Sequence, residues 1–138
     1  MKAGEEPTMA KEIIHVSPIS EALAKGKIPL SPAVKANGFV FVSGLPPFDR
    51  KTGALVKGDI SVQTEASLEN VKAALEAAGS SLEKVVKATI YISNAAHFPT
   101  VNAIYARYFP KDPPARTFVA VGSWPLEFDI EVECIAVV

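Results

Sequence analysis

The chain has 138 residues, which is enough for one ordinary domain and too short for two substantial ones. Hydrophobic residues make up 49% of the chain and charged residues 21%, so it can build a core and is too apolar for a disordered protein. A formal net charge of −1 supplies no positive field for nucleic acid or anionic lipid, so we expect neither as a partner. One cysteine excludes an intrachain disulfide, and with only two histidines beside it we expect no bound metal.

The ends of the chain carry no targeting signal that the sequence makes evident. No apolar run approaches the roughly 20 residues that span a bilayer, and the first residues lack the apolar centre of a signal peptide. We therefore expect a cytoplasmic protein without a membrane segment. Residues 1–10 are polar or small and are predicted to be a disordered leader, with a single domain over residues 11–138.

In the first third of the chain, prolines and glycines separate two short apolar segments. A strand is expected over residues 12–16, and a long connection follows over residues 17–38. Such long loops are often functional or pack on a partner. The next segment, residues 39–44 (FVFVSG), is apolar at every position up to the serine, which is typical of a strand covered on both faces.

An amphipathic helix is predicted over residues 59–78, because Asp59 can cap its start and Gly79 can end it in a left-handed conformation. Its apolar positions recur at steps of three and four residues and so lie on one face: Leu68, Val71, Leu75 and Ala78. The period then changes to two over residues 84–93, which predicts a strand with these residues on its apolar face: Val86, Ala88, Ile90 and Ile92.

A second helix is expected over residues 96–109, where Pro99 is tolerated because it falls in the first turn. Its aromatic cluster is interpreted as helix core first and subunit contact second: Tyr105, Tyr108 and Phe109. Two strands follow over residues 116–122 and 127–138, and alternation in the last one places Cys134 on the apolar face as a core residue.

These elements predict one α+β domain, a mixed sheet with two helices on one face. Two helices cannot cover both faces of a sheet. Apolar residues on the second face of the last strand, such as Ile135 and Val137, would be exposed in a single copy. We therefore predict a symmetric oligomer in which the sheets pack on one another.

Arg116 is the most unusual charged residue, because it opens a mostly apolar strand directly after the rigid segment 113–115. One interpretation is an ion pair with Glu131 or Glu133 of a neighbouring strand. The other is a carboxylate clamp, since the planar guanidinium fits a small acid in a bidentate manner. The sequence has no GxSxG, P-loop or GxGxxG motif that would point to another chemistry.

Four separated segments resemble the Rid (reactive intermediate deaminase, YjgF-like) family over residues 31–138: FVFVSGLPP with the later KTG, SLENVKAALEAAGSSLEKVVKATIYI, FPTVNAIYARYFP, and PARTFVAV followed by IEVECIAVV. The resemblance implies a fold like the bacillus type of chorismate mutase. It also implies assembly as a trimeric barrel, with ligand clefts between subunits and no cofactor.

The same resemblance implies hydrolysis of 2-imino or 2-enamino acids to 2-keto acids and ammonia. By position, Arg116 matches the arginine that grips the substrate carboxylate, and Glu131 matches the glutamate that positions water. Four further positions match residues that line the substrate cleft: Ser43, Gly44, Asn102 and Phe118.

Three departures from the family pattern bear on the substrate. Ala33 stands where many members have tyrosine, Leu45 where many have glutamine, and Phe118 where many have cysteine, which indicates a more apolar pocket. Deamination of aminomuconate or aminoacrylate, a noncatalytic carboxylate-binding or chaperone-like role, and the ribonuclease activity attached to some relatives stay open as alternatives. His15 and His97 are interpreted as surface or capping residues, and Trp124 as a turn aromatic at the edge of the core or on a partner surface.

Overall fold

A computed structural model describes residues 10–138 of the chain, so most of the predicted leader lies outside the described residues. These residues form one six-stranded mixed sheet in the order β1-β2-β3-β6-β4-β5. Its strands are β1 (Glu12–Ile14), β2 (Ala33–Ala36), β3 (Phe39–Leu45), β4 (Val85–Ile92), β5 (Ala115–Ala120) and β6 (Ile130–Val137). The helices are α1 (Ile19–Lys25), α2 (Ile60–Ala77) and α3 (Phe98–Tyr108), with short 3-10 turns η2 (Leu82–Lys84) and η3 (Ala95–His97).

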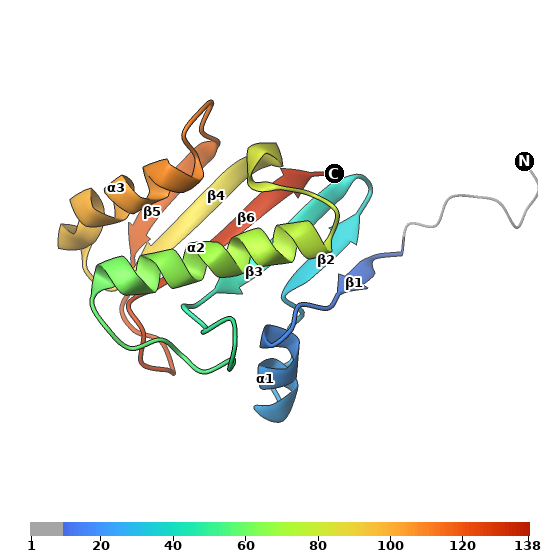
Figure 1. Cartoon of the computed structure of the whole chain (residues 1–138), viewed down its shortest axis with the longest axis horizontal. Helices are drawn as coiled ribbons and strands as arrows, with labels where there is room; N and C mark the ends of the chain where they lie inside the picture. The colour runs from blue at the N-terminus through green and yellow to red at the C-terminus, as the bar shows by residue number, and fades with distance from the viewer. Residues whose placement is uncertain (1–9) are drawn as a thin grey trace, which may run out of the picture.

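The long helices α2 and α3 cover one face of the sheet, and α1 lies beyond one end of it (Figure 1). This arrangement confirms the predicted α+β domain with one mixed sheet. Only β4 and β5 run parallel, and α3 connects them, because parallel neighbours need a crossover that a helix can supply. The crossover leaves β5 at the edge of the sheet, paired with β4 alone.

The long connection predicted over residues 17–38 is wrong in part, because it contains α1 and β2. Strand β2 pairs with β3 through a two-residue turn at Asn37 and Gly38, whose φ angles are 51° and 82°. Positive φ at both central residues is the geometry that Asn-Gly favours in tight hairpins. The turn dipeptide was the signal for this hairpin, and the prolines before it concealed the short strand.

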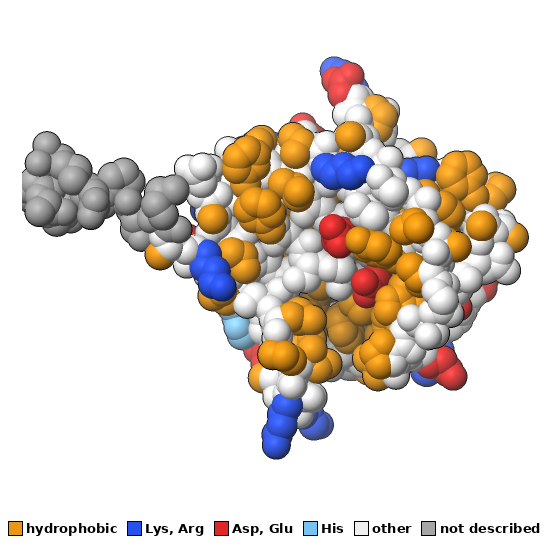
Figure 2. Space-filling view, turned by 180° about the vertical axis from the view of Figure 1, so that it is seen from behind, with side chains coloured by type: hydrophobic (Ala, Val, Ile, Leu, Met, Phe, Trp, Pro, Cys, Tyr) orange, Lys and Arg blue, Asp and Glu red, His pale blue; other side chains and the backbone are white. Residues whose placement is uncertain are grey.

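Strand β3 is covered on only one face, contrary to the prediction. Val40 and Val42 are buried beneath α2, whereas Phe39 and Phe41 are 39% and 44% exposed on the opposite face. Figure 2 shows this open face, where apolar side chains gather around a few acidic ones. Val137 of β6 is also exposed there, as the sequence predicted, and the face is apolar enough to pack against another protein surface.

Two bulges interrupt the regular pairing of the sheet. In β3, Val42 pairs with Cys134 and Leu45 with Val132, so Ser43 and Gly44 together oppose one residue of β6. In β4 the register shifts between Val85 and Lys87.

The bulge in β4 reverses one predicted side chain. It leaves Val85 buried and Val86 46% exposed, so the prediction that Val86 lies on the apolar face is wrong. A bulge adds a residue to one strand, and the alternation of faces changes at that point.

Helix α2 begins and ends as predicted. The Asp59 side chain accepts a hydrogen bond from the Val62 amide at 3.1 Å, and Gly79 has a φ of 83° just beyond the last turn. All four predicted apolar residues of this helix are buried. Cys134 is buried against the same core, and burial raises the pKa of its thiol to about 12, as suits a core residue rather than a nucleophile.

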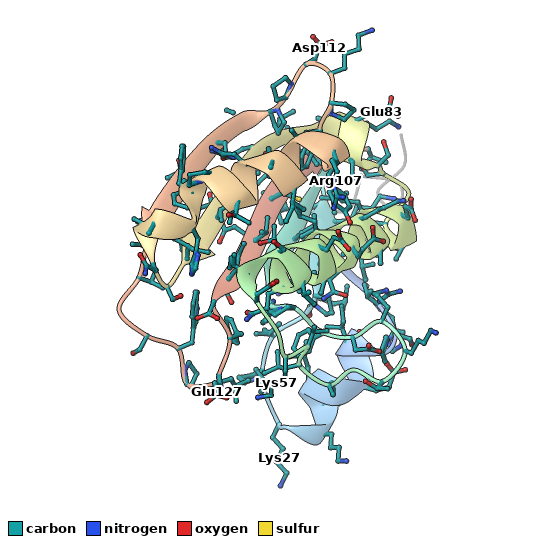
Figure 3. All side chains as sticks on the ribbon, turned by 60° about the vertical axis from the view of Figure 1, so that its left-hand side comes forward. Lys27, Lys57, Glu83, Arg107, Asp112 and Glu127 are labelled. Atoms are coloured by element: carbon teal, nitrogen blue, oxygen red, sulfur yellow. The ribbon has the colours of Figure 1, made fainter. Side chains whose placement is uncertain are left out.

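Loops meet at the end of the sheet where β5 and β6 connect. Lys57, before α2, forms an ion pair with Glu127, before β6, at 3.3 Å, and Figure 3 shows their side chains next to each other. Within residues 10–138, no helix is long and apolar enough to cross a bilayer. The same residues hold no group of three or more potential metal-binding side chains.

Candidate active site

The guanidinium of Arg116 lies on the face of the sheet that the helices cover. Arg116 is in register with Ala88 of β4, which is in register with Cys134 of β6. Residues in register share a face, and Cys134 is buried beneath α2. Because β5 is the edge strand, Arg116 is only half-buried at the rim of the core.

Three aromatic rings surround the guanidinium. Its central carbon lies 4.8 Å from the ring centre of Tyr105, 5.7 Å from that of Phe98 and 5.9 Å from that of Phe118. Phe98 and Phe118 also meet edge to face at 4.9 Å. We call these three rings the aromatic collar. The electron-rich faces of such rings attract a cation, so the collar holds the guanidinium without neutralising it.

The ion pair considered for Arg116 is wrong. Glu131 and Glu133 belong to β6, which is separated from β5 by β4, and their side chains lie on the open face. The Arg116 side chain makes no hydrogen bond or ion pair with another residue of the described chain. A half-buried guanidinium with no internal anion leaves its donors available to an external one.

Two more polar atoms beside the collar have no partner within residues 10–138. The side-chain oxygen of Asn102 and the hydroxyl of Tyr105 are both buried and make no hydrogen bond. Phe98, Asn102 and Tyr105 recur at spacings of four and three along α3 and so form one stripe facing β5. The structure therefore brings together three of the predicted site residues: Arg116, Asn102 and Phe118.

A second group lies on the open face, where Glu131 rests against Gly44 of the β3 bulge. A Cβ atom at Gly44 would lie 2.5 Å from the carboxylate oxygen of Glu131 and 2.9 Å from its carboxyl carbon. Only glycine leaves room for the carboxylate in this position. The neighbouring Ser43 hydroxyl donates to the Ser31 carbonyl at 2.6 Å.

Glu131 and Gly44 line a small cavity of 150 Å³ whose other walls are mostly apolar. Leu45 and Trp124 contribute to these walls, and the Trp124 ring packs on Phe128 at 4.5 Å. Ala33 is fully buried in β2 and does not line the cavity. The apolar pocket indicated by Leu45 therefore exists beside Glu131, whereas Phe118 lies in the collar on the other face.

The environment of Glu131 favours its protonated form. Burial raises the pKa of this carboxyl above its ordinary value, the charge of Glu133 raises it further, and a hydrogen bond with Trp124 opposes both effects. Glu133 in turn accepts a hydrogen bond from the Tyr91 hydroxyl at 3.0 Å. A raised pKa makes this carboxyl a stronger base than an ordinary glutamate once it is deprotonated.

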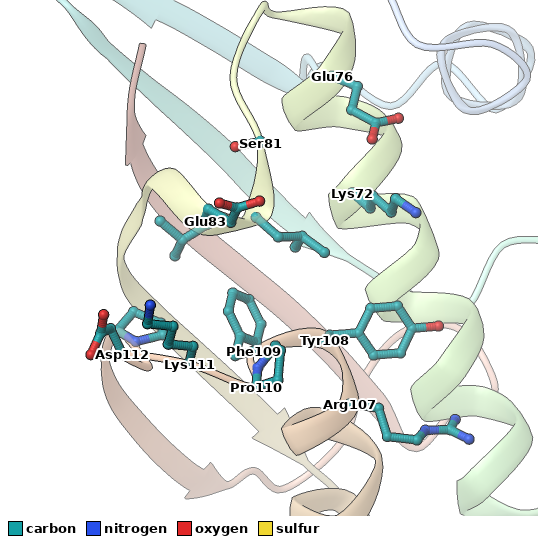
Figure 4. A pocket seen from close by; sticks show the side chains of 13 residues that line it. Lys72, Glu76, Ser81, Glu83, Arg107, Tyr108, Phe109, Pro110, Lys111 and Asp112 are labelled. Carbon is teal, nitrogen blue, oxygen red and sulfur yellow. The ribbon is translucent and has the colours of Figure 1, made fainter.

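The predicted site residues thus form two groups on opposite faces, and one chain does not bring them together. A separate hollow of about 610 Å³ contains none of them. It lies between α2, η2 and the loop after α3, and mixed charges line it; Arg107 and Tyr108 point from α3 towards α2 (Figure 4).

Sequence reasoning assigned Tyr105 to the helix core and Trp124 to a turn at the core edge or on a partner surface, and it did not single out Phe98. The spacing of Phe98, Asn102 and Tyr105 was the available signal, because it puts two aromatic residues on the same helix face as a predicted site residue. Nothing in the sequence placed Trp124 beside Glu131.

The comparisons with known proteins agree with this fold. The model of the endoribonuclease L-PSP family matches residues 21–138. The chain belongs to this family, which is also called the YjgF/RutC or Rid family. It is 49% identical to a RutC family protein of Pyrococcus horikoshii, over 78% of this chain and 86% of that protein. It is 41% identical to the chloroplastic Reactive Intermediate Deaminase A of Arabidopsis thaliana, over 94% and 67%.

Solved structures show the same relationship. The crystal structure of yeast Mmf1 matches with a TM-score of 0.83 at 35% identity, covering 93% of this chain and 98% of that one. Escherichia coli TdcF, crystallised with bound serine, matches with a TM-score of 0.74 at 36% identity, covering 79% and 87%.

Proposed function

We propose that this protein hydrolyses reactive 2-imino and 2-enamino acids to 2-keto acids and ammonia. The observation that carries the proposal is Arg116, a guanidinium within the aromatic collar that has no internal anion in the described chain. A planar fork of donors suits the carboxylate that every such substrate carries. The kinship with a protein named Reactive Intermediate Deaminase A supports this reaction, and the serine bound to TdcF supports a small amino-acid-like ligand.

The chemistry makes modest demands on the protein. An enamine first tautomerises to the imine, and water then attacks the imine carbon to give a carbinolamine. The carbinolamine hydroxyl then loses its proton and the nitrogen gains one, so the C–N bond breaks, ammonia leaves and the C=O bond of the keto acid forms. Glu131 accepts the proton from water and returns it to nitrogen, a role typically worth about 10²–10⁴-fold in rate. Neither a metal nor a covalent nucleophile is needed for this sequence.

The two groups require two copies of the chain in one site, since Arg116 and Glu131 lie on opposite faces. We propose a homotrimer in which Arg116, Asn102 and Phe118 of one protomer face Glu131, Gly44 and Ser43 of the next. The exposed Phe39 and Phe41 on the open face support such packing, because burying them removes apolar surface from water.

A complementation experiment tests the shared site. The Arg116→Ala and Glu131→Gln variants are each expected to be inactive alone in an assay that generates imines with an amino-acid oxidase. When the two variants are unfolded and refolded together, random assembly restores about a quarter of the clefts with both groups intact. Recovery of about that fraction supports the proposal, whereas no recovery in mixed oligomers confirmed by mass spectrometry contradicts a shared site.

The identity of the imine depends on the apolar cavity beside Glu131. We propose that it takes the side chain of the substrate, so imines of branched or aromatic amino acids should react at least as fast as the iminopropanoate derived from alanine. Rates measured for imines of several side-chain sizes decide this point. A preference for aminoacrylate or aminomuconate would assign the chain to another branch of the family.

Two experimental results would favour a different function for this protein. Binding of 2-keto acids without faster imine decay would indicate a noncatalytic carboxylate-binding protein. RNA cleavage that survives repurification and is lost with Arg116→Ala would instead support the endoribonuclease activity for which the family is named. A cytoplasmic location stays a prediction, because relatives are named for the chloroplast and the mitochondrion.

A further inference from the structure

We propose that Tyr105 is a positioning residue that holds the Arg116 guanidinium ready for the substrate carboxylate. This inference rests on the proposed function, in which Arg116 binds that carboxylate. Tyr105 is the nearest member of the aromatic collar, 4.8 Å from the central guanidinium carbon. Its own position is rigid, because it is only 6% exposed and stacks on Phe109 at 4.5 Å.

The ring is the part of Tyr105 that acts on Arg116. The Tyr105 hydroxyl makes no hydrogen bond within residues 10–138, so it does not hold the guanidinium by a polar contact. Burial raises the pKa of this hydroxyl to about 12, so it stays protonated and supplies no negative charge to Arg116. The face of the ring remains as the attractive surface, and tyrosine is among the rings that bind cations well.

The acidic side chains nearest to α3 are already engaged. Glu65 of α2 forms an ion pair with Arg107, and Glu69 accepts a hydrogen bond from the Tyr108 hydroxyl at 2.7 Å. Neither acid pairs with Arg116. The guanidinium therefore has aromatic rings around it, and its N–H groups make no hydrogen bond within residues 10–138, so they stay available for a bidentate carboxylate.

Positioning matters because arginine has a long and flexible side chain. Ordering such a side chain on binding costs affinity, and a residue that orders it beforehand removes that cost. Tyr105 should therefore affect how tightly the carboxylate binds more than how fast the bound imine reacts. Loss of the ring is expected to raise KM and the Kd for a keto acid by about 2- to 30-fold, the range of one cation–π contact.

The test compares substitutions at two tyrosines of the same helix. Tyr105→Leu removes the ring beside Arg116, and Tyr108→Leu makes the same change on a side chain that points to α2 (Figure 4). Affinity for 2-oxobutanoate is measured by calorimetry, and imine hydrolysis is measured in parallel. We expect weaker binding and a raised KM for Tyr105→Leu with a smaller change in kcat, and no such change for Tyr108→Leu.

The conservative variant Tyr105→Phe tests whether the ring or the hydroxyl of Tyr105 positions Arg116. It keeps the ring, so it should recover the affinity for 2-oxobutanoate that is lost in Tyr105→Leu. If Tyr105→Leu does not fold, Tyr105→Met replaces it, because methionine fills the space with an adaptable apolar chain and no ring face. Folding is checked by circular dichroism and by oligomeric state.

Each outcome separates this inference from the proposed function. A folded Tyr105→Leu or Tyr105→Met variant that binds 2-oxobutanoate as tightly as the wild type overturns the inference and leaves the function standing. Tyr105→Phe as weak as Tyr105→Leu overturns the role of the ring. Wild-type binding of 2-oxobutanoate without hydrolysis overturns the function while the affinity comparison still decides the role of Tyr105. A wild-type chain that does not bind 2-oxobutanoate overturns both.

Discussion

Arg116 and Glu131 project from opposite faces of the same sheet. The first is in register with Ala88 on the face that α2 and α3 cover, and the second is in register with Tyr91 on the open face. One protomer cannot direct both groups at a ligand as small as an imino acid. The chemistry proposed for the pair therefore depends on how copies of the chain meet.

The shape of the Arg116 side chain should matter as much as its charge. Arg116→Lys keeps the positive charge but loses the fork of parallel donors, so it should weaken binding of 2-oxobutanoate by about tenfold, the value of one hydrogen bond to a charged group. Calorimetry measures the change. Arg107→Lys is the matched control, because Arg107 is an exposed partner of Glu65 and lies outside the site. Equal affinity of Arg116→Lys and wild type would contradict bidentate binding.

A methyl group at Gly44 should displace the Glu131 carboxylate, for which we propose a catalytic role. In Gly44→Ala the new Cβ would stand 2.5 Å from the Glu131 oxygen, so the flexible carboxylate must move. A displacement of about 1 Å at a reacting group costs about 10²-fold in rate, and we expect a loss of that order in kcat with the fold intact.

Gly122→Ala provides the control for this substitution. A Cβ at Gly122 meets nothing within 4 Å, so this variant should retain wild-type kcat. Steady-state kinetics on both variants decide the point. Full activity in Gly44→Ala would show that Glu131 need not occupy this position.

The pH dependence of hydrolysis should move when Glu133 loses its charge. Glu131 must be deprotonated to accept a proton from water, so the rate rises with pH through the raised pKa of this carboxyl. Glu133→Gln removes one cause of the elevation, the pKa of Glu131 falls, and the acid limb of the profile shifts to lower pH. Profiles of kcat/KM measure the shift. An acid limb that stays in place or moves to higher pH would exclude Glu131 as the titrating group.

The unpaired hydroxyl of Tyr105 should lower the stability of the fold. A buried hydroxyl without a partner costs about 1–3 kcal/mol, so Tyr105→Phe is expected to raise the free energy of unfolding by up to about that amount. Urea unfolding measures the difference, and Tyr108→Phe serves as the comparison, because it loses a hydrogen bond to Glu69. A Tyr105→Phe variant less stable than wild type would reveal a partner for the hydroxyl in the assembled protein.

The sequence allowed α2, α3 and the last strand to be predicted because their signals are local, whereas α1 was missed. Asp59 and Gly79 delimit α2, and the alternation around Cys134 identifies the buried face of β6. Strand β2 was concealed because four residues are too few to show a period. The prediction for Val86 was wrong because the bulge depends on how β4 pairs with β6, which the sequence of β4 alone does not show.

Individual residues of the candidate site could be predicted from the sequence, but their arrangement in space could not. Arg116 stood out because it opens a mostly apolar strand, and Glu131 stood out by family resemblance. Their separation onto two faces follows from the registers of β5 on β4 and of β4 on β6. The contact of Tyr105 with Arg116 joins a helix to the strand after it, and helical spacing alone made Tyr105 a core residue. Such contacts depend on how distant segments of the chain pack together. The periodicity of the sequence carries no information about that packing.

The bulge at Ser43 and Gly44 restricts how this gene can change in length. Deletion of one residue there would let β3 and β6 pair without a bulge. The deletion would also move the buried side chains on one side of the bulge to the exposed face, and the exposed ones to the buried face. Phe39 and Phe41 would then turn beneath α2, or Leu45 would turn into solvent. A substitution near the bulge therefore leaves the two faces of β3 as they are, whereas a deletion within it exchanges buried and exposed residues.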